Sequence, residues 1–96
     1  MNFHIQTAKI FLEQLSKLSK KSKKLVQEKI ILLKENPFRF KRIHSKKFNK
    51  VFRIRLNLDG KESRLIYAVI EPNIIIVCLL DRNKNYTDLE KYLKKI

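Results

Sequence analysis

Residues 51–70 read VFRIRLNLDGKESRLIYAVI and contain an Asp-Gly pair between two runs of strand-forming side chains. From Phe52 to Leu58, apolar and polar positions alternate, which is the period of a strand with one buried face. The Asp59-Gly60 pair, which holds the chain's single glycine, is a strong signal for a two-residue hairpin loop. The stretch therefore predicts a β-hairpin in which Leu58 pairs with Lys61.

The register of this hairpin places three arginines on one face of the sheet. Counting outward from the turn, Arg55 lies opposite Arg64, and Arg53 lies opposite Ile66. Because side chains alternate across a sheet, the three arginines share one face and the apolar residues share the other. The apolar face, which can pack on helices, consists of Phe52, Ile54, Leu56, Leu65, Tyr67 and Val69.

Two arginines directly opposite each other repel and destabilise a strand pair. The cluster is therefore either a solvated sheet face, whose register can slip, or a site for an anion. The planar guanidinium group matches phosphate oxygens better than an ammonium group does. Three such groups on one patch suit a phosphodiester that passes through an in-line transition state.

A short strand and an amphipathic helix are expected at the beginning of the chain. Phe3 and Ile5 alternate with polar residues, as in a strand with one buried face. Thr7 can cap the helix that follows. The apolar residues of that helix recur three and four positions apart, on one helical face: Ala8, Phe11, Leu15 and Leu18.

A second helix is expected after a turn at residues 19–24, and Ser22 can cap it. This helix must end near Asn36, because Pro37 disfavours a helical conformation in the residue before it. Its apolar stripe consists of Leu25, Val26, Ile30 and Leu33. The two helices form a helical hairpin that can cover the apolar face of the sheet.

The remaining segments are a connector, a third strand of the meander and a terminal helix. Residues 38–50 show no clear period and form a basic connector. Glu71-Pro72-Asn73 marks a turn, and the apolar run at residues 74–80 indicates a strand. A short terminal helix begins near Thr87, and its apolar side consists of Leu89, Tyr92 and Leu93.

A chain of 96 residues is long enough for one domain with one modest core. The expected fold class is α+β, with a single domain over residues 1–96. The expected order is a strand, two helices, a three-stranded antiparallel meander and a short helix.

The charge of the chain points to a polyanionic partner. Lys and Arg total 23 against nine Asp and Glu, which gives a formal net charge of +14. Folding does not require this charge, since self-repulsion opposes a compact state. Nucleic acid is the first candidate, an acidic protein the second and a membrane surface the last. An AT-rich genome would also raise the lysine content, but it accounts less well for the arginines.

Several classes of protein do not fit the sequence. Cys78 is the only cysteine, so no intrachain disulfide can form, and its apolar surroundings favour a core residue over a nucleophile. The apolar run around it is too short to span a bilayer, and the first residues lack the order of a signal peptide. We therefore expect a cytoplasmic protein. Without metal-ligand spacing or a glycine-rich phosphate loop, no metal or cofactor is expected.

Four segments of the chain, taken in order, resemble the RelE/ParE toxin superfamily: Glu35-Asn36-Pro37, residues 52–56, residues 63–67, and Arg82 with Tyr86. The resemblance covers nearly the whole chain and depends on the ordered set, since no segment is specific by itself. It implies a RelE-like α+β fold, in which a twisted antiparallel sheet packs on a helical hairpin. It also implies the toxin of a type II toxin–antitoxin system, held inactive by an acidic, partly disordered antitoxin.

The resemblance assigns roles to individual residues. Arg53 and Arg55 match the basic pair on the family's second strand, and Arg64 matches the arginine of its third strand. Arg82 matches the arginine after the last strand, and Tyr86 matches the tyrosine near the C-terminus. In the branch that cleaves mRNA in the ribosomal A site, the ribose 2′-hydroxyl is activated to attack the adjacent phosphate. Positive side chains stabilise the charged transition state, and the tyrosine orients the nucleotide or stacks on its base.

The residues at the strand pair differ from those of some family members, and the difference affects which group can act as general base. Some members carry lysine at the strand pair, where it can act as the base, whereas arginine is effectively always protonated. Arg53 and Arg55 are therefore expected to stabilise charge. Three candidates for the general base therefore remain: Tyr86, His44 and a group of the ribosome. Histidine titrates near neutral pH and suits such a role, although a lone histidine among lysines is more often simply exposed.

The connector is expected to bind RNA through His44, Lys46, Lys47 and Lys50. The arginines and Tyr86 favour a ribosome-dependent mRNA endoribonuclease whose partners are mRNA, the ribosome and an antitoxin, with no membrane contact. Two alternatives stay open. One is a gyrase-directed toxin of the ParE type, which needs no such constellation, and the other is a non-catalytic module that binds RNA or ribosomes.

Overall fold

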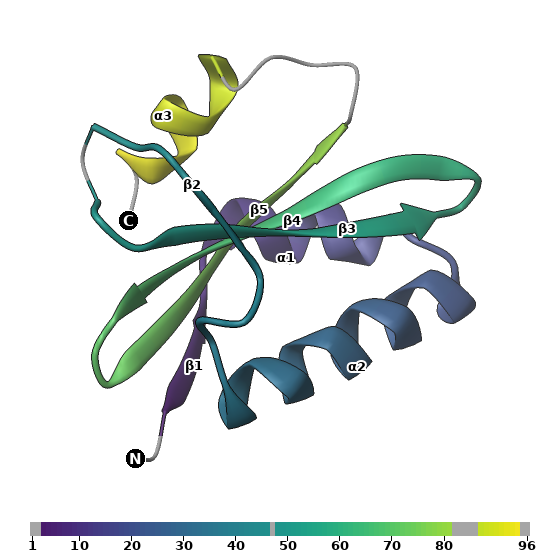
Figure 1. Cartoon of the computed structure of the whole chain (residues 1–96). Helices are drawn as coiled ribbons and strands as arrows, with labels where there is room; N and C mark the ends of the chain where they lie inside the picture. Colours follow the sequence, from purple (N-terminus) through teal and green to yellow (C-terminus); the bar gives the residue numbers. More distant parts are fainter. Residues whose placement is uncertain (1–2, 47, 82–86, 95–96) are drawn as a thin grey trace.

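Five strands form one sheet in the computed structural model, in the spatial order β1-β5-β4-β3-β2 (Figure 1). The structure describes residues 3–46, 48–81 and 87–94, and its helices and strands lie within these ranges. The strands are β1 (His4–Thr7), β2 (Lys41–Ile43), β3 (Val51–Leu58), β4 (Lys61–Ile70) and β5 (Asn73–Asp81). The helices are α1 (Lys9–Ser16), α2 (Lys20–Glu35) and α3 (Thr87–Leu93). This is the expected α+β order with one strand added.

The β3–β4 hairpin has the register that the sequence predicts. Arg55 pairs with Arg64, and Arg53 pairs with Ile66. The two turn residues both adopt positive φ, 52° at Asp59 and 81° at Gly60. A two-residue loop with positive φ at both positions matches the right-handed twist of the flanking strands. The prediction that the three arginines share one face is therefore confirmed.

The start of α2 is held by the turn of the hairpin, and the predicted cap at Ser22 is wrong. Ser19 is the N-cap, and its Oγ accepts a hydrogen bond from the Ser22 N–H at 3.2 Å. The Asp59 carboxylate accepts from the Ser19 N–H at 2.9 Å, from the Ser19 hydroxyl and from the Ser22 hydroxyl at 2.8 Å. These contacts let the helix begin at Lys20, because lysine is a good helix former once the terminal N–H groups have partners.

The N-terminal strand pairs with a strand from the far end of the sequence. β1 runs parallel to β5, with Ile5 beside Ile74. Thr7 belongs to this strand and does not cap α1, as the sequence had suggested. The N-cap is Ala8, which makes no side-chain capping bond, and its N–H donates to the Ile76 carbonyl at 2.9 Å. Pairing with β5 thus continues up to the first turn of α1 and keeps Thr7 extended.

The basic connector contains a strand that the sequence pattern does not reveal. β2 pairs antiparallel with the first residues of β3, with Lys41 beside Arg53 and Ile43 beside Val51. Three residues are too few to show an alternation of apolar and polar side chains. The Arg42 side chain donates two hydrogen bonds to the Asn49 carbonyl and so closes the loop between the two strands.

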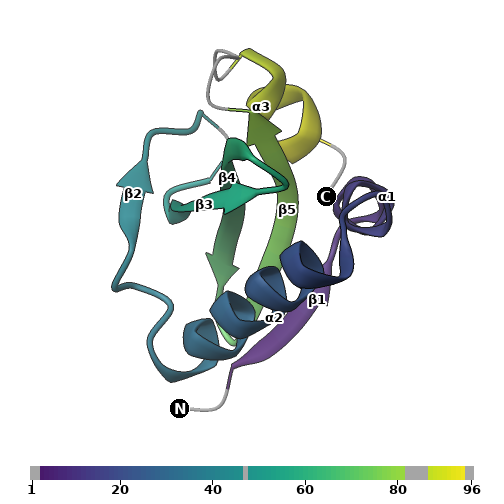
Figure 2. The ribbon, with the colours of Figure 1, turned by 90° about the vertical axis from the view of Figure 1, so that its right-hand side faces the viewer.

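Helices lie on both sides of the sheet (Figures 1 and 2), and the buried residues form two hydrophobic cores. The helical hairpin of α1 and α2 covers the first face, as predicted. The buried residues there include all six of the predicted apolar face together with Phe11, Val26 and Leu33. On the second face α3 packs over part of the sheet, and its core consists of Val51, Ile66, Ala68, Val77, Cys78, Leu80, Leu89 and Leu93.

The side chain of Gln14 links α1 to β5 by hydrogen bonds, at a point beyond the end of β1. Its side-chain amide donates to the Leu79 carbonyl at 2.8 Å and accepts from the Leu79 N–H at 2.7 Å. The amide therefore makes both hydrogen bonds that a neighbouring strand would make with Leu79. This arrangement satisfies the backbone of β5 where no strand lies beside it.

Cys78 and Tyr67 belong to the interior. Cys78 is fully buried, and burial raises the pKa of its thiol to about 12, which confirms the prediction of a core residue. Burial also raises the pKa of Tyr67, whose hydroxyl donates to the Pro37 carbonyl at 2.6 Å. None of the helices over the described residues has both the length and the apolar character that crossing a membrane requires.

Candidate functional site

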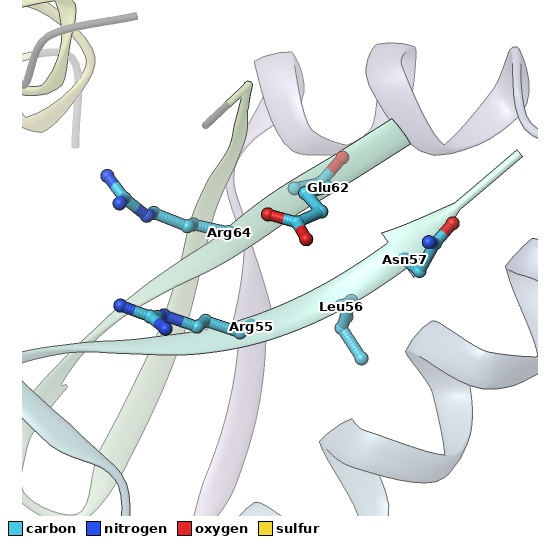
Figure 3. Close-up of a pocket in the computed structure, with 6 residues that line it drawn as sticks. Arg55, Leu56, Asn57, Glu62 and Arg64 are labelled. Atoms are coloured by element: carbon cyan, nitrogen blue, oxygen red, sulfur yellow. The ribbon is translucent and has the colours of Figure 1, made fainter. Parts of the chain in front are cut away.

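The arginine face, which we define as Arg53, Arg55, Arg64 and Glu62, is the basic face of the β3–β4 hairpin. Arg55 and Arg64 are cross-strand partners, and Figure 3 shows their side chains extending side by side in the same direction. A depression of about 240 Å³ lies beside them. Its lining consists of Arg55, Leu56, Asn57, Glu62, Ser63 and Arg64.

α3 covers one end of this face and leaves the other end open. Leu89 of α3 lies in the same core as Val51 and Ile66, which are the neighbours of Arg53 on its own face. Arg53 is accordingly only 9% exposed. Over the described residues, no buried side-chain nitrogen or oxygen lacks a hydrogen-bond partner, so Arg53 is buried without an unsatisfied donor. The open end, at Arg55 and Arg64, is the part that an anion can reach.

A second hollow, of about 420 Å³, lies along the edge of β3. It is bounded by α2, β2 and β3, and its lining consists of Lys29, Phe40, Lys41, Arg53, Ile54 and Arg55. Arg55 lines both hollows, so the positive surface continues from the depression around the edge of the sheet. The sequence analysis missed Lys29, Phe40 and Lys41 because their proximity depends on β2, which shows no period.

The connector residues lie in different places relative to the arginine face. His44 is exposed and lines a separate shallow hollow with Arg42 and Asn49. Lys46 is exposed, and its backbone N–H donates to the Glu90 carboxylate of α3 at 3.2 Å. The structure therefore places both residues beyond the depression, on the side of β2 and α3.

Lys50 is directed away from the arginine face. Its ammonium group forms an ion pair of 3.4 Å with Glu71 and lies 5.4 Å from the centre of the Phe38 ring. Phe38 in turn packs edge-to-face on Phe52, which belongs to the core under the helical hairpin. Lys50 thus lies on the opposite side of the sheet from Arg55. Lys47, Arg82 and Tyr86 lie outside the described residues.

Glu62 is a functional candidate that the sequence analysis did not identify. It pairs with Asn57 across the hairpin and lies two residues before Arg64, on the same face. The register that locates the three arginines also locates this carboxylate, but the sequence analysis considered only positively charged residues on this face. In Figure 3 its carboxylate lies beside the stems of Arg55 and Arg64, in the depression.

The arrangement can bind an anion and stabilise developing negative charge. Two guanidinium groups from adjacent strands extend in the same direction (Figure 3), and donors directed at the place where charge develops stabilise that charge. Over the described residues, no three His, Cys, Asp or Glu side chains gather closely enough to hold a metal ion. The chemistry available from the described residues is therefore electrostatic stabilisation together with one carboxylate.

The fold and site define a small α+β protein with a helical hairpin on one sheet face and a basic hairpin on the other. No family model matches the chain, and no curated protein matches it in sequence. Solved structures match it in fold. The isolated RelE toxin of E. coli superposes with a TM-score of 0.68 at 16% identity, over 100% of this chain and 100% of that one.

Two toxin–antitoxin complexes contain chains of the same fold. A chain of the E. coli RelBE complex has a TM-score of 0.66 at 18% identity, over 88% of this chain and 100% of that one. A chain of the archaeal RelE–RelB complex from Pyrococcus horikoshii OT3 has a TM-score of 0.65 at 21% identity, with the same coverage, 88% and 100%. The protein therefore has the RelE fold.

Proposed function

We propose that this protein is the toxin of a type II toxin–antitoxin system and that it cleaves mRNA on the ribosome. The observation that carries the proposal is the cross-strand pair of Arg55 and Arg64 at the open end of a basic sheet face. A fold shared with RelE makes the pair informative, because solved relatives of this fold are toxins. A purely structural sheet face would not favour two like charges in direct opposition.

The arginine pair suits the transition state of RNA cleavage by the ribose 2′-hydroxyl. In that reaction the phosphate gains negative charge while the attacking and leaving oxygens lie in line. Arg55 and Arg64 supply two guanidinium groups at the depression, and arginine binds phosphate oxygens in a bidentate manner. In this proposal Arg53 adds a buried positive charge two positions along β3 from Arg55, and Arg82 and Tyr86 complete the site around the scissile nucleotide.

The surrounding basic surface serves substrate binding. Lys29 and Lys41 line the hollow next to Arg55, and Phe40 offers an aromatic ring in the same hollow. Lysines along the path of a single strand neutralise phosphates, and aromatic rings stack on bases. In the proposal, His44, Lys46 and Lys47 extend the contact with mRNA and the ribosome, in the cytoplasm where both occur, whereas Lys50, which was expected to join them, lies on the other side of the sheet.

The partner that restrains this toxin is an acidic antitoxin. A net charge of +14 favours rapid encounter with an acidic chain. The E. coli and P. horikoshii relatives are found in complexes with RelB. The antitoxin of the present protein would cover the arginine face or displace α3, and the segment would become ordered on binding. Co-purification of the two neighbouring gene products tests this, and the lack of any acidic partner would favour a plain RNA-binding module.

The activity is tested by inducing the protein in cells and mapping mRNA ends by primer extension, beside a gyrase supercoiling assay. We expect cuts phased with the reading frame, and we expect Arg64→Ala and Arg82→Ala to abolish both the cuts and the growth arrest. Lys21→Gln, which removes one exposed positive charge from α2, is the matched control and should cut normally. Intact mRNA with inhibited supercoiling would assign the protein to gyrase. If mRNA stayed intact and both supercoiling and growth were normal, only the non-catalytic binding module would remain as an interpretation.

A further inference from the structure

Glu62 is the acidic side chain among the described residues that line the depression beside Arg55 and Arg64. It reaches the site from β4, as the cross-strand partner of Asn57, and shares a face with Arg64 two residues away. Figure 3 shows its carboxylate in the space next to the two arginine stems. A nucleotide whose phosphate is bound by the two guanidinium groups would share the depression with this carboxylate.

Among the described residues that line the depression, the side chains other than Glu62 carry no carboxylate, imidazole or amine. Arginine stays protonated at any ordinary pH, so Arg55 and Arg64 are excluded. Tyr67 is buried, and its hydroxyl already donates to the Pro37 carbonyl. His44 lines a different hollow, which shares no residue with the depression. Of the described residues that line the depression, Glu62 alone carries a group with the acceptor capacity of an ionised base.

We propose that Glu62 is the general base of the cleavage reaction, an inference that rests on the proposed function. The Glu62 carboxylate takes the proton of the ribose 2′-hydroxyl. The freed electron pair of the 2′-oxygen forms a bond to the adjacent phosphorus, and the bond from phosphorus to the 5′-oxygen breaks. The 5′-oxygen leaves with that electron pair and takes a proton from water. The hydroxide so formed removes the proton from Glu62. The products are a 2′,3′-cyclic phosphate and a 5′-hydroxyl, with the carboxylate regenerated.

A purely electrostatic role for Glu62 makes the opposite prediction. If the carboxylate only offsets the repulsion between Arg55 and Arg64, its neutralisation leaves the chemical step intact. It would also strengthen RNA binding, because one negative charge disappears from a basic surface. A general base, in contrast, typically contributes about 10²–10⁴ in rate. The rate of the chemical step therefore distinguishes the two roles, whereas both allow tighter binding.

The test measures single-turnover cleavage on ribosomes with mRNA in the A site, using wild type, Glu62→Gln and Glu28→Gln. Glu28 is exposed on α2, so its substitution makes the same change of charge away from the site. We expect Glu62→Gln to lose about a hundredfold or more in rate, with equal or tighter ribosome binding and an unchanged melting temperature. Glu28→Gln should cleave at the wild-type rate.

A second variant separates proton transfer from geometry. Glu62→Ala should regain cleavage when formate is added, whereas chloride at the same ionic strength should have no effect. A wild-type rate for Glu62→Gln, a loss explained by weaker binding, or equal recovery with chloride would overturn the role of Glu62 while leaving the endoribonuclease in place. Absence of cleavage by the wild-type protein would instead overturn the proposed function itself, and the inference with it.

Discussion

Arg55 and Arg64 face each other directly across the β3–β4 pair, at the end of the sheet that α3 leaves open. Like charges in this position destabilise a strand pair by an amount on the order of 0.2–1 kcal/mol. The Glu62 carboxylate lines the same depression as the two arginines. An anion bound between the two guanidinium groups would relieve this repulsion.

Replacing one member of the pair should separate stability from binding. We expect Arg55→Gln to raise the free energy of unfolding by up to about 0.2–1 kcal/mol, because the cross-strand repulsion disappears. The same variant should bind RNA more weakly, and its dependence of log K on log salt should become shallower by about 0.7, the value of one phosphate contact on a single strand. Urea unfolding and salt titrations measure both. A drop in stability would show that Arg55 supports the fold.

Tyr86→Phe separates two roles proposed for the tyrosine. The variant keeps the ring, so stacking on a base survives, but it lacks the hydroxyl needed for proton transfer. Because the described part of the site already provides Glu62, we expect a mild loss in the single-turnover rate. A loss as large as that of Glu62→Gln would instead show that the Tyr86 hydroxyl takes part in proton transfer.

The connector lysines should contribute unequally to binding. Lys46 is exposed beside α3, whereas Lys50 is engaged by Glu71 and Phe38 on the far side of the sheet. We expect the double variant of Lys46 and Lys47 to alanine to weaken ribosome binding and flatten its salt dependence. Lys50→Ala should leave the salt dependence nearly unchanged. If the salt dependence of ribosome binding were the same for all variants, the connector would not be part of the binding interface.

The contact between Asp59 and α2 should make stability depend on pH. Hydrogen bonds from the Ser19 hydroxyl, the Ser19 N–H and the Ser22 hydroxyl, in that order of size, lower the pKa of Asp59 from its usual 3.8. Because the folded-state pKa lies below the unfolded one, this stabilisation is present in full above about pH 4 and is lost as the pH falls through the folded-state pKa. Asp59→Asn should remove that acid-side decline in melting temperature, while Glu28→Gln should retain it.

Gln14 should protect the edge of β5. In Gln14→Leu, the partly buried N–H and C=O of Leu79 lose both partners, and each unsatisfied group costs about 1–3 kcal/mol. We expect a lower free energy of unfolding and concentration-dependent light scattering, since an unpaired strand edge is a template for association. Gln27→Leu, on the exposed side of α2, is the control. An equal effect from both variants would indicate hydrophobicity as the cause.

The central hairpin was predictable because its signals are local. Alternation in β3 and the Asp59-Gly60 turn determine which residues face each other, and the positions of Arg55 and Arg64 follow directly. The predicted caps failed for the opposite reason. Thr7, Ser19 and Ser22 all have side chains that can cap a helix, and the choice among them depends on distant partners, which are Ile76 for the residue after Thr7 and Asp59 for the two serines.

The extent of the open site was not predictable from the sequence. The burial of Arg53 requires α3 to lie over Val51 and Ile66, and no local sequence pattern indicates that contact. The hollow at Phe40 likewise depends on β2, a strand of three residues. Glu62, however, was within reach, because the same register that locates Arg64 places it on the arginine face.

The pairing of β1 with β5 has a consequence for the time course of synthesis. Ile5 lies beside Ile74 in the sheet, and translation adds about 5–20 residues per second, so the first strand is made several seconds before its partner. During that interval the apolar side of β1 and the Gln14 amide have no β5 to contact. The speed of the ribosome, and not the stability of the finished sheet, sets how long the N-terminal segments remain exposed to other chains and to chaperones.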